Sequence, residues 1–350
     1  MAELGRIELK LQYCLAIMRN RKEDSPSERF RGYYISENEM DAILGKAVDR
    51  VENEASVSHA SEATDLLKSL SLLEKGISAK KEESIRRGIT LKLVSLEQMF
   101  GLSPFDVDTL LVCLLPEIDL KYQRVYAYLQ DDVTQKSPTV DLVLKLLCES
   151  LPEMLERRKT FSADAPLIKY QLIKLFDNHT SKQTPLLDKS LQVDERIIHY
   201  LLGTDQIDPY LSRFMWSIHP ELNLEDMILP EETKQFIDTL ISRSEKAIVC
   251  YLYGDNGVGK QATVEGICKK LGFPVLCVEL NRMLLSKENT EILLPLILRE
   301  GMLWNAVLYL KGGNVLFSAE EAREFDGDYL VTELMDYPNW IFITDFVRFG

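Results

Sequence analysis

A short glycine-rich segment, Gly254-Asp255-Asn256-Gly257-Val258-Gly259-Lys260, has the residue types that bind phosphate groups. It follows a continuous apolar run over 247–253, which predicts a buried parallel strand, and helix-forming residues continue from it to Leu271. A strand, a glycine-rich loop and a helix in this order match the Walker A pattern GxxxxGK. In such a loop the backbone N–H groups and the helix dipole face phosphate oxygens, and Lys260 would reach the terminal phosphates. The loop therefore predicts nucleotide binding, with ATP as the expected ligand.

The positions that should hold a magnesium ion depart from this pattern. The residue after Lys260 is Gln261, where a Ser or Thr hydroxyl would ligate the metal of the nucleotide. A third buried strand over 306–310 ends in Lys311, where a P-loop ATPase has a carboxylate, and a lysine opposes a metal cation. We therefore expect weak ATP binding with little use of Mg²⁺, and we assign no catalytic residue and no metal ligand.

The remaining elements complete an alternating pattern of strands and helices, which is typical of a parallel α/β sheet. A second strand is predicted over 274–280, a long helix over 289–304 and a fourth strand over 340–345. Thr344 ends the fourth strand, where it could sense a phosphate or simply face solvent; Asp345 beside it could supply a displaced carboxylate, but we do not assign it that role. The candidate nucleotide-binding residues are Gly254, Asp255, Asn256, Gly257, Val258, Gly259, Lys260, Gln261 and Thr344.

The order of elements over 247–345 resembles that of AAA+ ATPases. Most of the chain, including FRGYYIS over 30–36, FGLSPFDVDTLLVCLLPEIDLKYQRVYAYLQDD from Phe100 and the stretch from Ala165, resembles AAA+ proteins with an N-terminal helical and winged-helix-like region. Some members of that group are encoded with contractile injection systems. The resemblance implies that this is the first, degenerate one of two ATPase modules, and that the complete protein forms an AAA+ oligomer. It also implies that the module is cut at Gly350, before a fifth strand and a helical lid.

The N-terminal region is predicted to be mainly helical. Apolar residues recur at three- and four-residue spacing from Leu4 to Met18, and Ser36 with Glu39 forms a capping box for a second helix. The polar stretch 52–64 predicts a linker, and 65–156 predicts helices, with Pro116 ending or kinking one of them. Two Ser-Pro pairs, at 103–104 and 137–138, predict helix starts.

A winged-helix-like unit is predicted at the end of this region. Strand patterns over 167–175 and 185–191 could pair, and Asp194 could cap a helix through 197–201. Arg196 and His199 on that helix stand among acidic residues, which favours protein contact or packing over DNA binding. The predicted domains are an N-terminal helical unit at 1–51, a helical and winged-helix-like domain at 65–222, and a degenerate P-loop domain at 223–350, which opens with a lead-in helix over 223–244.

Composition and charge exclude several classes of protein. The chain of 350 residues has a net charge of −14, from 55 acidic and 41 basic side chains, so broad nucleic-acid binding is not favoured. The basic run 157–159 is flanked by glutamates and predicts a solvated helix end. No apolar run approaches the roughly twenty residues of a membrane span. The six cysteines form no CxxC pair, which favours reduced thiols in a cytoplasmic protein over disulfides or zinc.

Three functions remain open at this point. The first is the N-terminal part of an AAA+ ATPase, with a recognition region and a nucleotide-binding module that serve ATP-driven remodelling or assembly of a partner protein complex. The second is a non-catalytic interaction scaffold that retains only the P-loop fold. The third, a winged-helix transcription regulator, requires a basic recognition helix, and the chain offers an acidic one.

Overall fold

The computed structural model describes residues 1–21, 59–177, 184–204, 206–243, 248–255, 257–286, 289–316 and 332–345. The chain forms two compact units, Met1–Gly203 (unit 1) and Thr204–Gly350 (unit 2). The boundary expected from the sequence lay at 222, but residues 204–222 belong to unit 2, because strand β3 (Met215–Ile218) joins its sheet. The predicted capping box of Ser36 and Glu39 lies outside the described residues.

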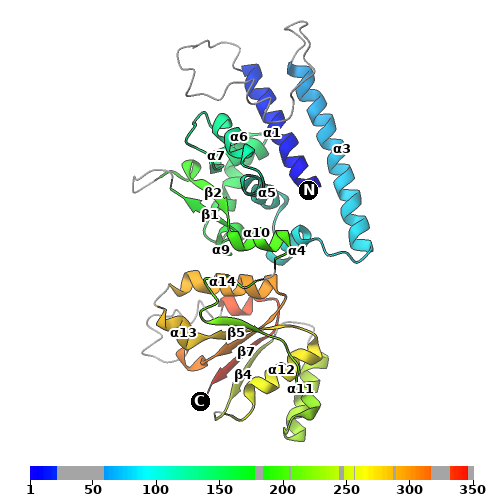
Figure 1. Cartoon of the computed structure of the whole chain (residues 1–350), viewed down its shortest axis with the longest axis vertical. Helices are drawn as coiled ribbons and strands as arrows, with labels where there is room; N and C mark the ends of the chain where they lie inside the picture. The colour runs from blue at the N-terminus through cyan, green and yellow to red at the C-terminus, as the bar shows by residue number, and fades with distance from the viewer. Residues whose placement is uncertain are drawn as a thin grey trace. The chain divides into compact units, whose positions relative to one another are not determined.

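Unit 1 is mainly helical, as the sequence predicts. Its helices are α1 (Ala2–Arg21), α3 (His59–Arg86), α4 (Lys92–Phe100), α5 (Pro104–Ile118), α6 (Lys121–Leu129), α7 (Val140–Leu147), α8 (Leu151–Arg157), α9 (Pro166–Lys169) and α10 (Glu195–Leu202). Helix α1 buries Ile7, Leu11 and Leu15, which belong to the apolar pattern that predicted it. Figure 1 shows α1 and α3 side by side and antiparallel. Because α3 begins at His59, residues 59–64 are helical rather than part of a linker.

The predicted start of α5 is confirmed in detail. The Ser103 hydroxyl accepts from the Asp106 N–H at 3.2 Å, and the Asp106 carboxylate accepts from the Ser103 N–H at 2.7 Å, which forms a capping box. Pro116 lies inside α5, which continues to Ile118, so the proline does not end the helix where it stands.

Helix α7 starts two residues later than the sequence predicted. Its N-cap is Thr139, whose hydroxyl accepts from the Leu142 N–H at 3.2 Å, and not Ser137. The reason is a β-like contact: the Leu191 N–H donates to the Pro138 carbonyl at 2.8 Å, which keeps this segment extended beside the hairpin.

A two-stranded ribbon follows the helices, as predicted, but most of the range 185–191 predicted for its second strand is a 3₁₀ turn over Leu186–Asp188, and the strand starts at Ser190. Strand β1 (Ile173–Phe176) pairs antiparallel with β2 (Ser190–Val193). The first part of the predicted strand is instead the short helix α9, because Pro166 at its first turn presets a helical φ. Asp194 caps α10 as predicted, accepting from the Arg196 N–H at 3.0 Å.

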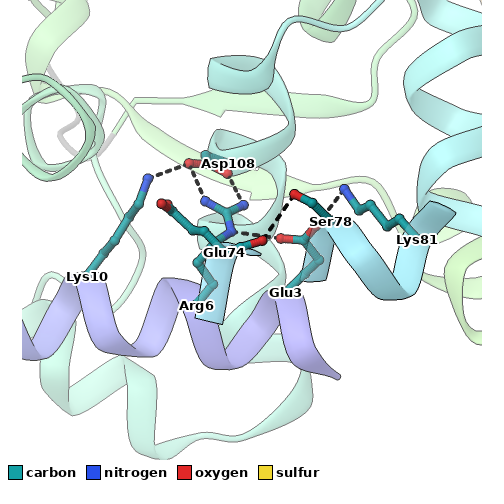
Figure 2. A network of polar contacts seen from close by, with 7 residues as sticks. All are labelled: Glu3, Arg6, Lys10, Glu74, Ser78, Lys81 and Asp108. Carbon is teal, nitrogen blue, oxygen red and sulfur yellow. Dashed lines mark hydrogen bonds and ion pairs between the residues drawn. The ribbon is translucent and has the colours of Figure 1, made fainter. Parts of the chain in front are cut away.

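A partly buried network of charged side chains joins α1, α3 and α5 (Figure 2). Asp108 on α5 accepts from both Arg6 and Lys10 on α1, with 2.9 Å from Arg6 Nη1 and 2.7 Å from Lys10 Nζ. Glu3 in turn accepts from Arg6 at 2.8 Å and contacts Lys81 of α3 at 2.6 Å. The network therefore ties three segments that are far apart in the sequence.

Unit 2 is an α/β unit with a mostly parallel five-stranded sheet. Its strand order is β3-β5-β6-β7-β4, and only β3 is antiparallel to its neighbour. The strands after β3 are β4 (Val249–Tyr253), β5 (Val275–Glu279), β6 (Val307–Lys311) and β7 (Ile341–Asp345). The helices are α11 (Glu231–Arg243), α12 (Lys260–Leu271), α13 (Leu280–Leu285) and α14 (Thr290–Leu303). The four parallel strands and α14 were predicted, whereas β3 and α13 were not. The lead-in helix predicted over 223–244 begins only at Glu231, after Pro230, and a 3₁₀ turn stands at Leu224–Asp226.

Helices cover both faces of this sheet (Figure 1). Ile237 of α11 and Val264 of α12 pack with Val275, Val307 and Phe342 in one apolar cluster. Helices α13 and α14 lie on the opposite side of the sheet (Figure 1). This double cover leaves the carboxyl ends of the parallel strands as the open edge of the unit. None of the described helices of the chain is both long enough and apolar enough to span a membrane.

Candidate phosphate-binding site

The glycine-rich loop joins β4 to α12, in the arrangement that the sequence predicts. Gly257 and Gly259 have φ values of 85° and 90°, in the left-handed region that favours glycine. Gly259 is the N-cap of α12 and provides no capping side chain, so the first-turn N–H groups lack a side-chain partner. Asp255 and Val258 are exposed on the loop, and Asn256 lies outside the described residues. An uncapped, positively polarised helix end behind a glycine loop suits an anion.

Lys260 bends back across this loop. Its Nζ donates to the Gly254 carbonyl at 2.6 Å and to the Asp255 carbonyl at 2.9 Å. These neutral carbonyl partners would exchange readily for phosphate oxygens, because hydrogen bonds between an ammonium group and an anion are stronger than those to a neutral acceptor. The ammonium group is therefore placed at the loop, as the prediction for Lys260 requires.

Four parallel strands end beside the loop and contribute a row of polar side chains. The strand register aligns Glu279 of β5 with Lys311 of β6, and Lys311 with Thr344 of β7. The adjacent pair Tyr253 and Asp345 extends the row to β4. A pocket of about 670 Å³ lies over this edge and includes Gly259, Lys260, Gln261, Glu279, Lys311 and Thr344 in its lining. Ligands of open α/β sheets bind at this edge.

The two residues that depart from the phosphate-loop pattern contact each other. Lys311 Nζ donates to the Gln261 Oε1 at 2.8 Å, and Gln261 Nε2 donates to Glu265 at 2.9 Å. Lys311 Nζ also lies 5.4 Å from the ring centroids of both Trp216 and Tyr309. The sequence identified both departures, but not that they form one interaction.

This arrangement does not fit a magnesium ion. Mg²⁺ requires near-octahedral oxygen ligands, and the amide oxygen of Gln261 already accepts from a cation. Glu265, Glu279 and Asp345 line the pocket, yet within the described residues no three His, Cys, Asp or Glu side chains form a group that could hold a metal ion. The expectation of little use of Mg²⁺ stays a prediction.

Thr344 is buried at the end of β7 and does not face solvent. Its hydroxyl donates to the Tyr309 hydroxyl at 3.4 Å. Burial raises the pKa of Tyr309 to about 12, with the Thr344 hydrogen bond acting against the rise, so the phenol stays neutral at physiological pH. Asp345 is also buried, and burial together with this carboxylate raises the pKa of Tyr251 to about 12. The hydroxyl groups of Thr344 and Tyr309 are therefore a neutral polar pair in the pocket lining.

Glu279 and Tyr309 are pocket residues that sequence reasoning did not select. A signal existed for Glu279, because it is the last polar residue of the predicted strand 274–280, and strand carboxyl ends line such sites. Tyr309 lies within an apolar run, where a tyrosine indicates core packing, and only the strand order shows that its hydroxyl reaches the pocket.

The fold and the site define a two-part chain, with a helical unit that contains a β-ribbon, followed by an α/β unit with a glycine loop at its open edge. A family model described as "Winged helix domain, variant" matches residues 1–215, which is more than half of the chain. The protein therefore belongs to this winged-helix family.

Comparison with solved structures gives a weak similarity for part of the chain. The structure titled "Crystal structure of FIGL-1 AAA domain" is 14% identical, with a TM-score of 0.32. The match covers 40% of this chain and 55% of that chain, so it spans about half of that chain's length. None of the curated proteins matches.

Proposed function

We propose that unit 2 binds ATP through the 254–260 loop and hydrolyses it poorly or not at all. The observation that carries this proposal is the loop itself: two left-handed glycines, an uncapped helix N-terminus and the Lys260 ammonium group lie together at the open edge of a parallel sheet. The contact between Gln261 and Lys311 supports poor hydrolysis, because it occupies the two positions that would otherwise hold a metal ion to neutralise a developing phosphate charge.

Unit 1 is proposed to recognise a protein partner rather than nucleic acid. The helix that follows the ribbon, α10, buries Arg196, whose exposed fraction is 4%, so this cation is not offered to a phosphate backbone. His199 remains on that helix among Glu195 and other acidic residues. A recognition unit joined to a nucleotide module suits ATP-driven remodelling or assembly of a partner complex in the cytoplasm, as the N-terminal part of an AAA+ oligomer.

The alternative is a non-catalytic interaction scaffold that retains the fold without a ligand. The Lys311–Gln261 contact favours it, since a pocket that has lost its metal site has lost part of its reason to bind a nucleotide. The combination of two left-handed glycines, an uncapped helix N-terminus and Lys260 in one loop opposes it, because an ordinary turn between a strand and a helix requires only the glycines.

Calorimetric titration with ATP distinguishes a nucleotide-binding unit from a scaffold without a ligand. The chain and its Lys260→Ala variant are titrated with ATP, and phosphate release is followed in parallel. We expect binding by the chain, roughly 10- to 100-fold weaker binding by the variant, and negligible phosphate release from both. Lys269→Ala is the matched control, because Lys269 lies in the last turn of α12 and donates to the Glu221 carbonyl at 2.5 Å. No binding by either protein would leave unit 2 a scaffold, and equal binding by both would show that Lys260 and the loop do not hold the ATP, which overturns the proposed site.

A further inference from the structure

We propose that the Lys311 ammonium group takes the role of the missing metal ion, so that unit 2 selects a nucleotide polyphosphate that is free of divalent metal. This inference rests on the proposed nucleotide function of the same pocket and adds the chemical form of the ligand. It concerns a specificity-determining residue that ordinary phosphate loops do not have.

Lys311 stands at one of the positions that hold the metal ion in phosphate-loop enzymes. The metal of a phosphate-loop enzyme is held by the residue after the loop lysine and by an acid at a strand end. Here these two positions are Gln261 and Lys311, and they are hydrogen-bonded to each other at 2.8 Å. The cation of the pair therefore comes from the protein itself, at the edge of the pocket that also contains Lys260.

Neighbouring side chains hold the Lys311 ammonium group in place. Gln261 is fixed on its other side by Glu265, at 2.9 Å. The rings of Trp216 and Tyr309 each lie 5.4 Å from the ammonium nitrogen and attract it through their negative faces. Trp216 belongs to β3, so the extra antiparallel strand contributes directly to holding this lysine. A lysine fixed on three sides is a preorganised charge, unlike a mobile surface lysine.

The pocket lining contains both acidic side chains and lysines. Glu265, Glu279 and Asp345 line the same pocket and would repel a bare triphosphate. Lys260 and Lys311 are the cations that the pocket lining offers within the described residues, so Lys311 is needed to offset part of this repulsion. A magnesium ion carried in with the nucleotide would meet Lys311 as a like charge and would have to displace it from Gln261. The site should therefore prefer ATP over its magnesium complex.

The test is a set of titrations of the chain with ATP and with inorganic triphosphate, each in EDTA and in excess Mg²⁺. We expect ATP to bind in EDTA and to bind roughly tenfold more weakly in Mg²⁺. Lys311→Met keeps the apolar stem and removes the charge. It should weaken binding in EDTA roughly 10- to 100-fold and abolish the difference between the two buffers. Inorganic triphosphate that binds as ATP does would identify the polyphosphate chain as the ligand, and its failure to bind would identify the nucleotide.

Two further variants test whether the effect on binding is specific to the charge of Lys311. Lys269→Met removes one charge from the last turn of α12, the helix that begins at Lys260. It should leave the affinity for ATP unchanged in EDTA and in Mg²⁺. The double variant Gln261→Thr/Lys311→Asp replaces the built-in cation with metal ligands and should reverse the preference, so that Mg²⁺ strengthens ATP binding. Thermal melting confirms that each variant is folded before it is titrated.

The outcomes separate this inference from the proposed function. If the chain binds ATP and Lys260→Ala does not, but Mg²⁺ strengthens wild-type binding or Lys311→Met binds as wild type, nucleotide binding stands and the role of Lys311 is wrong. If the chain binds no ATP in either buffer, both proposals are overturned.

Discussion

Replacing Asp108 with asparagine should destabilise unit 1 far more than a matched replacement at the surface. Asp108 is the shared acceptor for Arg6 and Lys10, with exposed side-chain fractions of 11%, 12% and 21% (Figure 2). Asp108→Asn keeps the shape and removes the charge, so two partly buried cations lose their common partner. The control is Asp141→Asn, which breaks an exposed pair with Lys145 on one helix.

The magnitude follows from burial. Breaking a buried ion pair by removing one partner costs about 3–5 kcal/mol of unfolding free energy. Arg6 keeps its bond to Glu3, and Lys10 is partly solvated, so we expect about 2–3 kcal/mol for Asp108→Asn. The exposed Asp141 pair should be worth no more than about 0.5 kcal/mol.

The assay is urea unfolding of the whole chain with two probes. All three tryptophans, Trp216, Trp304 and Trp340, belong to unit 2, so their fluorescence reports that unit, while far-UV circular dichroism includes the helices of unit 1. Asp108→Asn should lower the midpoint of the dichroism transition assigned to unit 1 and leave the fluorescence transition in place. Equal effects of Asp108→Asn and Asp141→Asn would refute the reasoning.

The same network predicts a pH dependence. Burial alone would raise the pKa of Asp108, but hydrogen bonds from Arg6 and the charges of Lys10 and Arg6 lower it below the ordinary value of 3.8. A carboxyl whose pKa is lowered by folding stabilises the native state above its unfolded pKa, and this contribution is lost as the pH falls through the lowered value. The stability difference between the wild type and Asp108→Asn should therefore be constant between pH 7 and about pH 5 and shrink below about pH 4. A difference that shrinks already near pH 6 would contradict the assignment.

Three smaller changes test the packing and capping of the two units by the same unfolding assays. Gly301→Ala should cost about 1–3 kcal/mol, because its Cβ would lie 2.9 Å from ring carbons of the buried Tyr337; an unchanged midpoint would contradict this. Gly76→Ala, in the exposed middle of α3 with no atom within 4 Å, should instead stabilise by about 0.5–1 kcal/mol, and a loss would argue against that helix. Ser103→Ala removes the cap of α5 and should cost about 1 kcal/mol, whereas Ser103→Thr should restore most of it.

Local signals in the sequence were enough to predict most of the elements that carry the site. The apolar run before Gly254, the glycines and the helix-forming residues after Lys260 each act within a few residues of one another, so strand, loop and helix could be placed. The capping of α5 by Ser103 and of α10 by Asp194 is local in the same way.

The features that sequence reasoning missed depend on contacts between distant residues. Strand β3 has only four residues and owes its conformation to pairing with β5. No local sequence pattern predicts that pairing. The hydrogen bond between Lys311 and Gln261 joins residues 50 positions apart, and Arg6 meets Asp108 across 102 positions. The sequence shows that Gln261 and Lys311 are unusual, and only the fold shows that their side chains are hydrogen-bonded to each other.

The most direct test of the central claim is amide hydrogen exchange across the 254–263 segment, with and without ATP in EDTA. A phosphate chain held by the N–H groups of the loop and the first turn of α12 would slow exchange at Gly257, Gly259 and Lys260, and Lys260→Ala would remove most of this protection. Exchange in this segment that saturating ATP leaves unchanged would contradict the phosphate-binding account, even if ATP altered exchange elsewhere in the chain.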